Sequence, residues 1–134
     1  MHEPSSEPWW RTDPNRVALA NPKLAPYGAA ASEAMRKQGV WSVWEPKLVM
    51  GENINQAAQF AVSGNVDTGF LAASQQARLT SLEGQIVEIE LQDPSVLRQY
   101  AVLVGDHPSA SAFLAFLASD TAEAILTEQG YQLP

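Results

Sequence analysis

The chain has 134 residues, a formal net charge of −7, 46% hydrophobic residues and 17% charged residues, which is the composition of one modest globular domain. The negative charge argues against nucleic acid and anionic membranes as partners, because both select basic surfaces. The absence of cysteine excludes disulfides, thiolate nucleophiles and Cys-based zinc or iron–sulfur sites.

Residues 1–15 are rich in proline and predict a tail or linker. Trp9 and Trp10 within it are expected to pack on the nearest apolar surface, with stacking on a ligand as the alternative. No apolar run approaches the roughly 18 residues of a membrane span. The first residues are polar and acidic, which is unlike a signal peptide.

From residue 16 onward, short apolar runs alternate with amphipathic stretches. Strands are predicted over 16–20, 47–50, 66–72, 86–91 and 100–104. Helices are predicted over 28–38, 54–62, 74–79, 110–118 and 120–128, the last with a capping-box-like start at Asp120. Strands that alternate with helices predict an α/β fold with a largely parallel sheet.

Two predicted strand-to-helix turns have the features of an anion site. Residues 21–31 follow the first strand, and residues 51–53 lead from the second strand into the next helix. Each turn gathers free backbone N–H groups at the positive end of a helix dipole, so the pair suits an anion without Lys or Arg. The same residues also fit ordinary helix starts, with Tyr27 filling the core and Asn53 acting as an N-cap. The residues alone leave both interpretations open.

Other motifs do not indicate catalysis, and we expect the protein not to be an enzyme. The two histidines, His2 and His107, lack the spacing of metal ligands, and no metal site is expected. The sequence contains no Gly-x-Ser-x-Gly elbow, no Gly-x-Gly-x-x-Gly motif and no P-loop. Glu88 and Glu90 share one face of a predicted strand, where a solvated face is expected rather than an acid–base pair.

Three segments in the same order carry a family resemblance: RVALANPKLAPYGAAASEA, PKLVMGENINQAAQFAVSGNVDTGF and SAFLAFLASDTAEAILTEQGY. From about Asn15 to its end, the chain resembles the periplasmic molybdate-binding proteins of molybdate ABC importers. The resemblance implies a type II periplasmic-binding-protein fold, in which two α/β lobes hold an oxyanion in their cleft. Residues 16–89 would form the second lobe, a parallel-rich sheet flanked by helices. Residues 90–134 would supply a crossover strand and the C-terminal helices of the first lobe, whose N-terminal part has no counterpart here.

The resemblance also implies a function and a site. The protein would bind molybdate or tungstate in the periplasm, without another cofactor, and deliver the oxyanion to the membrane permease of an ABC transporter. The family's second-lobe donors correspond to Tyr27 and Ile54, each acting through its backbone N–H. The Tyr hydroxyl that some members place after the third strand is absent, because Ala72 occupies that position. Because such proteins are exported, we expect this chain to be a mature or engineered fragment, or a product that stays inside the cell.

Two further hypotheses belong to other functional classes. One is an interaction or structural module that has lost oxyanion binding, because Phe113, Leu114, Phe116 and Leu117 would lack their usual partner segment. A domain-swapped homo-oligomer, or pairing with a separate fragment, would cover this apolar face. The other is the sensing half of a cytoplasmic regulator, which the lack of a helix-turn-helix segment or basic stretch disfavours.

Overall fold

The computed structural model describes residues 8–79, 87, 89–93 and 97–134, and its sheet has three parallel strands. The strands are β1 (Val17–Ala20), β2 (Leu48–Gly51) and β3 (Thr68–Gly69), arranged in the order β2-β1-β3. Val17 of the central strand is in register with Leu48 on one side and with Thr68 on the other. The predicted α/β fold with a parallel sheet is therefore confirmed.

The predicted helices occur in the predicted order with small shifts at their bounds, and α2 is a further short helix that was not predicted. They are α1 (Pro26–Lys37), α2 (Trp41–Trp44), α3 (Ile54–Val62), α4 (Gln76–Leu79), α5 (Pro108–Leu117) and α6 (Asp120–Glu128), with 3-10 turns η1 (Trp9–Arg11), η2 (Glu45–Lys47) and η3 (Ala73–Gln75). α1 and α5 each begin two residues before the predicted start, because proline fits the first helical turn, where no N–H is needed. The α6 cap is Ser119, whose Oγ accepts from the Ala122 N–H at 3.2 Å, and not Asp120 as predicted.

β1 is covered on both faces, as a parallel sheet requires. Its four residues are at most 1% exposed. Val17 and Leu19 belong to a core cluster with Met35 of α1 and Trp44 of α2. On the opposite face, the Cβ of Ala18 lies beside Gly69 and near α3, where only small side chains separate helix and sheet.

Aromatic packing anchors the N-terminal segment, as predicted for its tryptophans. The Trp9 ring lies edge-on to Phe70 at a centroid distance of 5.5 Å and to Trp44 at 5.8 Å. Trp10 contacts Trp9 in the same way, at 5.7 Å. Such edge-to-face pairs each contribute about 0.5–1.5 kcal/mol beyond area burial, so η1 is held on the core cluster.

Two predicted strands differ in the structure. The predicted strand at 66–72 is reduced to Thr68–Gly69. It is flanked by the Asp67 N–H, which donates to the Arg16 carbonyl at 3.2 Å, and by the Phe70 N–H, which donates to the Ala18 carbonyl at 2.9 Å. Residues 100–104 form no strand, and Tyr100, Val102 and Val104 are 78–86% exposed. A strand needs a neighbouring edge to pair with, and none lies beside this segment in the part of the chain described. The prediction for 86–91 falls partly outside the described residues, as does Glu88.

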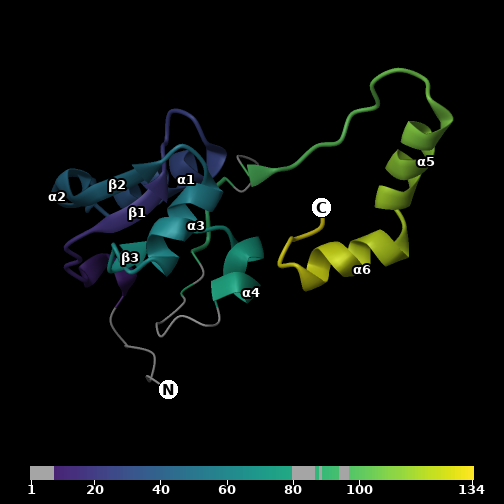
Figure 1. The fold of residues 1–134 in the computed structure, drawn as a ribbon. Coiled ribbons are helices and arrows are strands. Elements are labelled where there is room, and N and C mark those ends of the chain that lie inside the picture. Colours follow the sequence, from purple (N-terminus) through teal and green to yellow (C-terminus); the bar gives the residue numbers. More distant parts are fainter. Residues whose placement is uncertain (1–7, 80–86, 88, 94–96) are drawn as a thin grey trace.

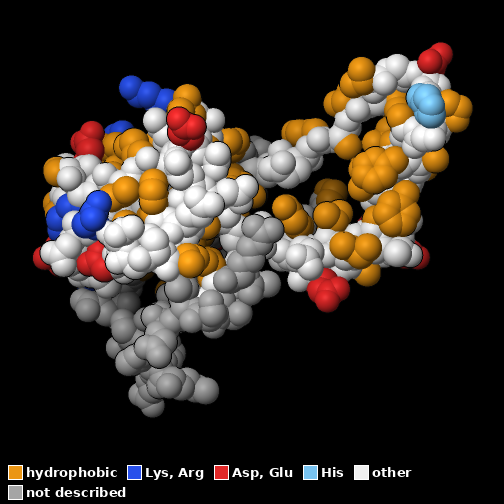
Figure 2. Space-filling model, in the orientation of Figure 1, with side chains coloured by type: hydrophobic (Ala, Val, Ile, Leu, Met, Phe, Trp, Pro, Cys, Tyr) orange, Lys and Arg blue, Asp and Glu red, His pale blue; other side chains and the backbone are white. Residues whose placement is uncertain are grey.

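α5 and α6 stand apart from the sheet, joined to it by the extended segment before α5 (Figure 1). Phe113, Phe116 and Ile125 on these helices are 44–61% exposed, and Figure 2 shows hydrophobic side chains gathered over both. The turn after α6 lies against η3, since a Cβ on Gly130 would lie 2.9 Å from the Ala73 carbonyl oxygen. Within the described ranges no single helix is long and apolar enough to cross a membrane; α5 and α6 meet that criterion only as a pair bent by 62°.

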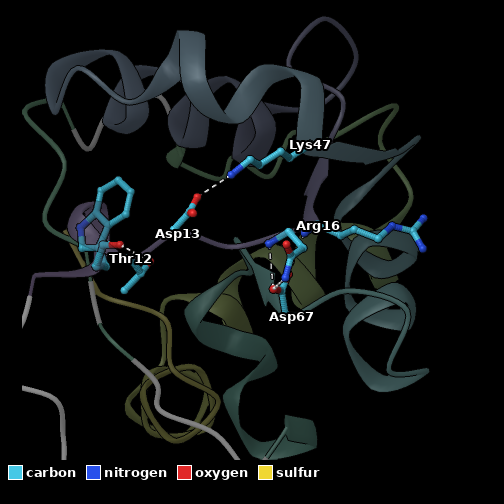
Figure 3. Close-up of polar contacts among 7 residues, drawn as sticks. Thr12, Asp13, Arg16, Lys47 and Asp67 are labelled. Carbon is cyan, nitrogen blue, oxygen red and sulfur yellow. Dashed lines mark hydrogen bonds and ion pairs between the residues drawn. The ribbon is translucent and has the colours of Figure 1, made fainter.

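The Asp67 carboxylate accepts hydrogen bonds from the backbone just before β1, at the amino edge of the sheet (Figure 3), an arrangement that we call the Asp67 clasp. Its Oδ1 accepts from the Arg16 N–H and its Oδ2 from the Asn15 N–H, both at 2.8 Å. Partial burial raises the pKa of the Asp67 carboxyl, but the hydrogen bonds from Asn15 and Arg16 outweigh burial and lower the pKa below its usual 3.8. The ionised carboxylate therefore fixes where β1 begins beside β3.

This clasp predicts how stability depends on acid. Because the pKa of Asp67 is lower in the folded chain than in the unfolded chain, its contribution is present above the unfolded pKa and is lost as pH falls through the folded pKa. We expect the free energy of unfolding of the wild type to fall more steeply than that of Asp67→Asn between about pH 5 and pH 3. Denaturant titrations across that range measure the two slopes. Parallel slopes would show that the clasp does not form.

Candidate functional site

The candidate site lies at the carboxyl edge of the sheet, where all three parallel strands end. Ala20 and Gly51 are the last registered pair of β1 and β2. Beyond them the Asn21 N–H donates to the Gly51 carbonyl at 2.7 Å. This bond holds together the segments that follow β1 and β2, so the turns that lead into α1 and α3 start side by side. Such an edge of an α/β sheet is where ligands usually bind.

The first turn of α1 presents unpaired N–H groups at this edge. Ala25 is the N-cap residue in an extended conformation, and the first backbone bond into the helix runs from the Ala29 N–H to the Ala25 carbonyl at 3.1 Å. The Tyr27 and Gly28 N–H groups precede that bond and have no acceptor among the described residues. Gly28 lets α1 approach β1, because a Cβ there would lie 2.0 Å from the Ala20 carbonyl oxygen.

The Tyr27 side chain is half-buried beside the turn after α6. Burial raises the pKa of its phenol, and the neighbouring Tyr131 raises it further. The phenol is therefore neutral at physiological pH and places no negative charge near the two helix starts. This proximity also brings the end of the chain to the same edge as α1.

The first turn of α3 is capped by side chains in a way that leaves two N–H groups free. Asn53 Oδ1 accepts from the Gln56 N–H at 2.9 Å, and Gln56 Oε1 accepts from the Glu52 N–H at 2.7 Å. This reciprocal pair resembles a capping box and fixes the entry into the helix. The Ile54 and Asn55 N–H groups have no acceptor in the described part of the chain.

Gln75 of η3 is a residue that sequence reasoning missed. Its side chain is buried, and its carboxamide contacts both the start of α3 and the segment that follows β3. No sequence signal distinguishes it, since the neighbouring Gln76 is the same residue type and is exposed. Only the packing of η3 against α3 identifies the buried one.

The predicted site residues thus lie at one edge, on the first turns of helices that follow neighbouring strands. The free donors are backbone N–H groups, which suit an anion because they add no net charge. Hollows lie elsewhere on the described part of the chain, one beside Glu33 and Lys37 and another beside Arg16 and Asp67. Among the residues described, no three His, Asp or Glu side chains are grouped to hold a metal ion.

Comparisons with known proteins identify related sequences. The family described as bacterial extracellular solute-binding protein matches residues 7–132. The molybdate-binding protein ModA of Rhodobacter capsulatus is 43% identical over 124 residues, covering 90% of this chain and 48% of that protein. ModA of Azotobacter vinelandii is 39% identical over 123 residues, covering 87% and 48%. The chain thus spans about half the length of the curated relatives it matches.

A solved structure shares the fold. The periplasmic molybdate-binding protein of Azotobacter vinelandii superposes with a TM-score of 0.67 at 24% sequence identity. The match covers 92% of this chain and 56% of that one. The arrangement of strands and helices described above is therefore that of part of a periplasmic binding protein.

Proposed function

The chain belongs to the family of bacterial extracellular solute-binding proteins, and we propose that it binds molybdate or tungstate for an ABC importer. The observation that carries the proposal is a pair of backbone N–H donors, on Tyr27 and Ile54 at neighbouring helix starts, that have no acceptor among the described residues. The names of the relatives at 43% and 39% identity support the choice of oxyanion. The protein is proposed as a binding protein and not an enzyme, acting in the periplasm and delivering its ligand to the membrane permease.

A tetrahedral dianion fits these donors chemically. Backbone N–H groups and the positive ends of α1 and α3 stabilise negative charge without requiring a cationic side chain. We assign residues 16–89 to one lobe and residues 90–134 to a crossover and helices of the other lobe, so the cleft would need further donors opposite this edge. Fixed donors of this kind would select an oxyanion by its size more than by its charge.

The test is calorimetric titration of the chain with molybdate and tungstate, with sulfate as the control. We expect saturable heat with molybdate or tungstate and none with sulfate at the same concentration. Equal heats for all three anions would count against a selective site. No heat from protein shown to be folded by circular dichroism would reject oxyanion binding by this chain.

The exposed apolar face of α5 and α6 favours a second candidate function, an interaction module that associates with a second copy of itself. Phe113 and Phe116 on α5 and Ile125 on α6 are all exposed. Burial of such a face favours association, and exchange of α5 and α6 between two chains would cover it. Light scattering would then give the mass of a dimer, and Phe113→Ser would return it to a monomer. A wild-type monomer at high concentration would reject this candidate.

A further inference from the structure

We propose that Gln75 is a positioning residue, whose buried carboxamide orients the peptide between Ile54 and Asn55 and so aims the Asn55 N–H at the anion. The inference rests on the proposed oxyanion function and deepens it. It assigns a role to a residue that does not itself reach the ligand.

The burial of Gln75 is the first observation. Its side chain is 6% exposed, and it is the one buried polar side chain among the residues described. A buried carboxamide is costly unless its donors and acceptor are engaged. In Gln75 they are: Oε1 accepts from the Ala72 N–H at 3.0 Å, and Nε2 donates to the Ile54 carbonyl at 3.2 Å and to Asn55 Oδ1 at 3.3 Å.

The identity of these partners is the second observation. The Ile54 carbonyl and the Asn55 N–H belong to the same planar peptide and point in opposite directions. A hydrogen bond that fixes the carbonyl therefore fixes the direction of the N–H. A carbonyl that accepts a hydrogen bond also polarises its peptide, which strengthens the N–H as a donor. Gln75 additionally holds the Asn55 side chain, so the whole residue is restrained.

The anchoring of Gln75 itself is the third observation. Its Oε1 accepts a hydrogen bond from the Ala72 N–H, in the segment that follows β3. The carboxamide therefore links this segment to α3, the helix that follows β2. Behind it, the turn after α6 places Gly130 against Ala73 at the start of η3. The segment that carries Gln75 is thus held by the Ala72 hydrogen bond and by the turn after α6. Its side chain therefore contacts α3 from a fixed position.

Only an amide side chain of this length supplies one acceptor and two donors at once. Glutamate keeps the shape and the acceptor, but once ionised it offers no donor to Ile54 or Asn55. Methionine keeps the length and loses all three hydrogen bonds. These two substitutions therefore test the loss of the hydrogen-bond donors while the size of the side chain stays nearly the same.

The experiment compares Gln75→Met and Gln75→Glu with Gln76→Met, the same change at the exposed neighbour. Molybdate Kd is measured by calorimetry on the full 134-residue chain, together with the thermal midpoint. We expect both Gln75 variants to raise Kd at least ten-fold and Gln76→Met to stay within two-fold of wild type. If a folded Gln75 variant only lowers the midpoint and leaves Kd unchanged, the residue is merely structural and the proposal is overturned. Should Gln75→Met not fold, Gln75→Glu alone decides.

A second readout keeps the inference testable without ligand binding. In proton–nitrogen spectra, Gln75→Met or Gln75→Glu should shift the Asn55 amide resonance and speed hydrogen exchange at Gln56 several-fold, whereas Gln76→Met should do neither. If wild type binds no oxyanion but these amides respond, the oxyanion function fails and the orienting role stands. If the amides are unchanged, the orienting role is rejected whatever the binding result.

Discussion

Replacing Ile54 with proline should weaken molybdate binding by roughly 10- to 100-fold while leaving the fold intact. The substitution removes one N–H, and a hydrogen bond to a charged group contributes about 1.5–3 kcal/mol. Proline is well tolerated at the first position of a helix, where the N–H has no intrahelical partner. The preceding residue must be extended, and Asn53 already is, with φ −149° and ψ 174°. Calorimetry and thermal unfolding together measure the two effects.

The matched control is Ile54→Val, which keeps the N–H and a similar side chain, and it should bind within about three-fold of wild type. Tyr27→Phe is the companion control at the other helix start, because it removes only the hydroxyl. If Ile54→Pro binds as tightly as wild type, the Ile54 N–H is not a donor to the oxyanion. If Ile54→Val is equally weak, the side chain and not the backbone carries the effect.

Replacing Gly28 with alanine should destabilise the chain by about 3 kcal/mol, against the usual sign of this change in a helix. Alanine normally gains about 1 kcal/mol over glycine inside a helix. Here the added Cβ would lie 2.0 Å from the Ala20 carbonyl oxygen and 2.7 Å from its carbon. These are backbone atoms that cannot rotate away, so α1 must move off β1, and overpacking of this kind typically costs about 1–3 kcal/mol or more.

Denaturant unfolding of Gly28→Ala measures this loss, and Gly64→Ala is its control. Gly64 has a φ of +76° and nothing within 4 Å of its added Cβ, so that variant reports the backbone strain alone, about 1 kcal/mol. We also expect Gly28→Ala to lose oxyanion binding, because α1 carries the Tyr27 donor. A Gly28→Ala protein as stable as wild type would mean that α1 does not pack this closely on β1.

The sequence was sufficient to predict the elements whose signals are local. The run Ile54–Val62 has an N-cap residue, a helical apolar spacing and a terminating glycine, and α3 has the predicted bounds. Buried apolar runs likewise located β1 and β2 within one residue at each end. Because these two strands and the helices that follow them were located, the two strand-to-helix turns could be predicted to share one edge of the sheet. The choice of Tyr27 and Ile54 within those turns came from the family resemblance.

Features that depend on distant partners were predicted less well. Residues 100–104 have the apolar composition of a strand, but the described residues give them no edge to pair with, and they stay exposed. Gln75 has no local signature at all, because its role depends on contacts with residues twenty positions earlier. The composition of a segment indicates which structure it can form. Whether it forms that structure depends on whether the fold places a suitable neighbour beside it.

Small residues lie where α3 meets the sheet. A Cβ added to Gly69 would lie 3.5 Å from the Ala18 Cβ and 3.8 Å from the Ala61 Cβ, so little space remains between sheet and helix there. Side chains this small can hardly be made smaller, so nearly every substitution at these positions adds volume. Sequence change in the middle of the sheet can therefore lift α3 away but can hardly draw it closer. Residues in the middle of the sheet therefore influence where α3 and its Ile54 donor lie, although they are not part of the site.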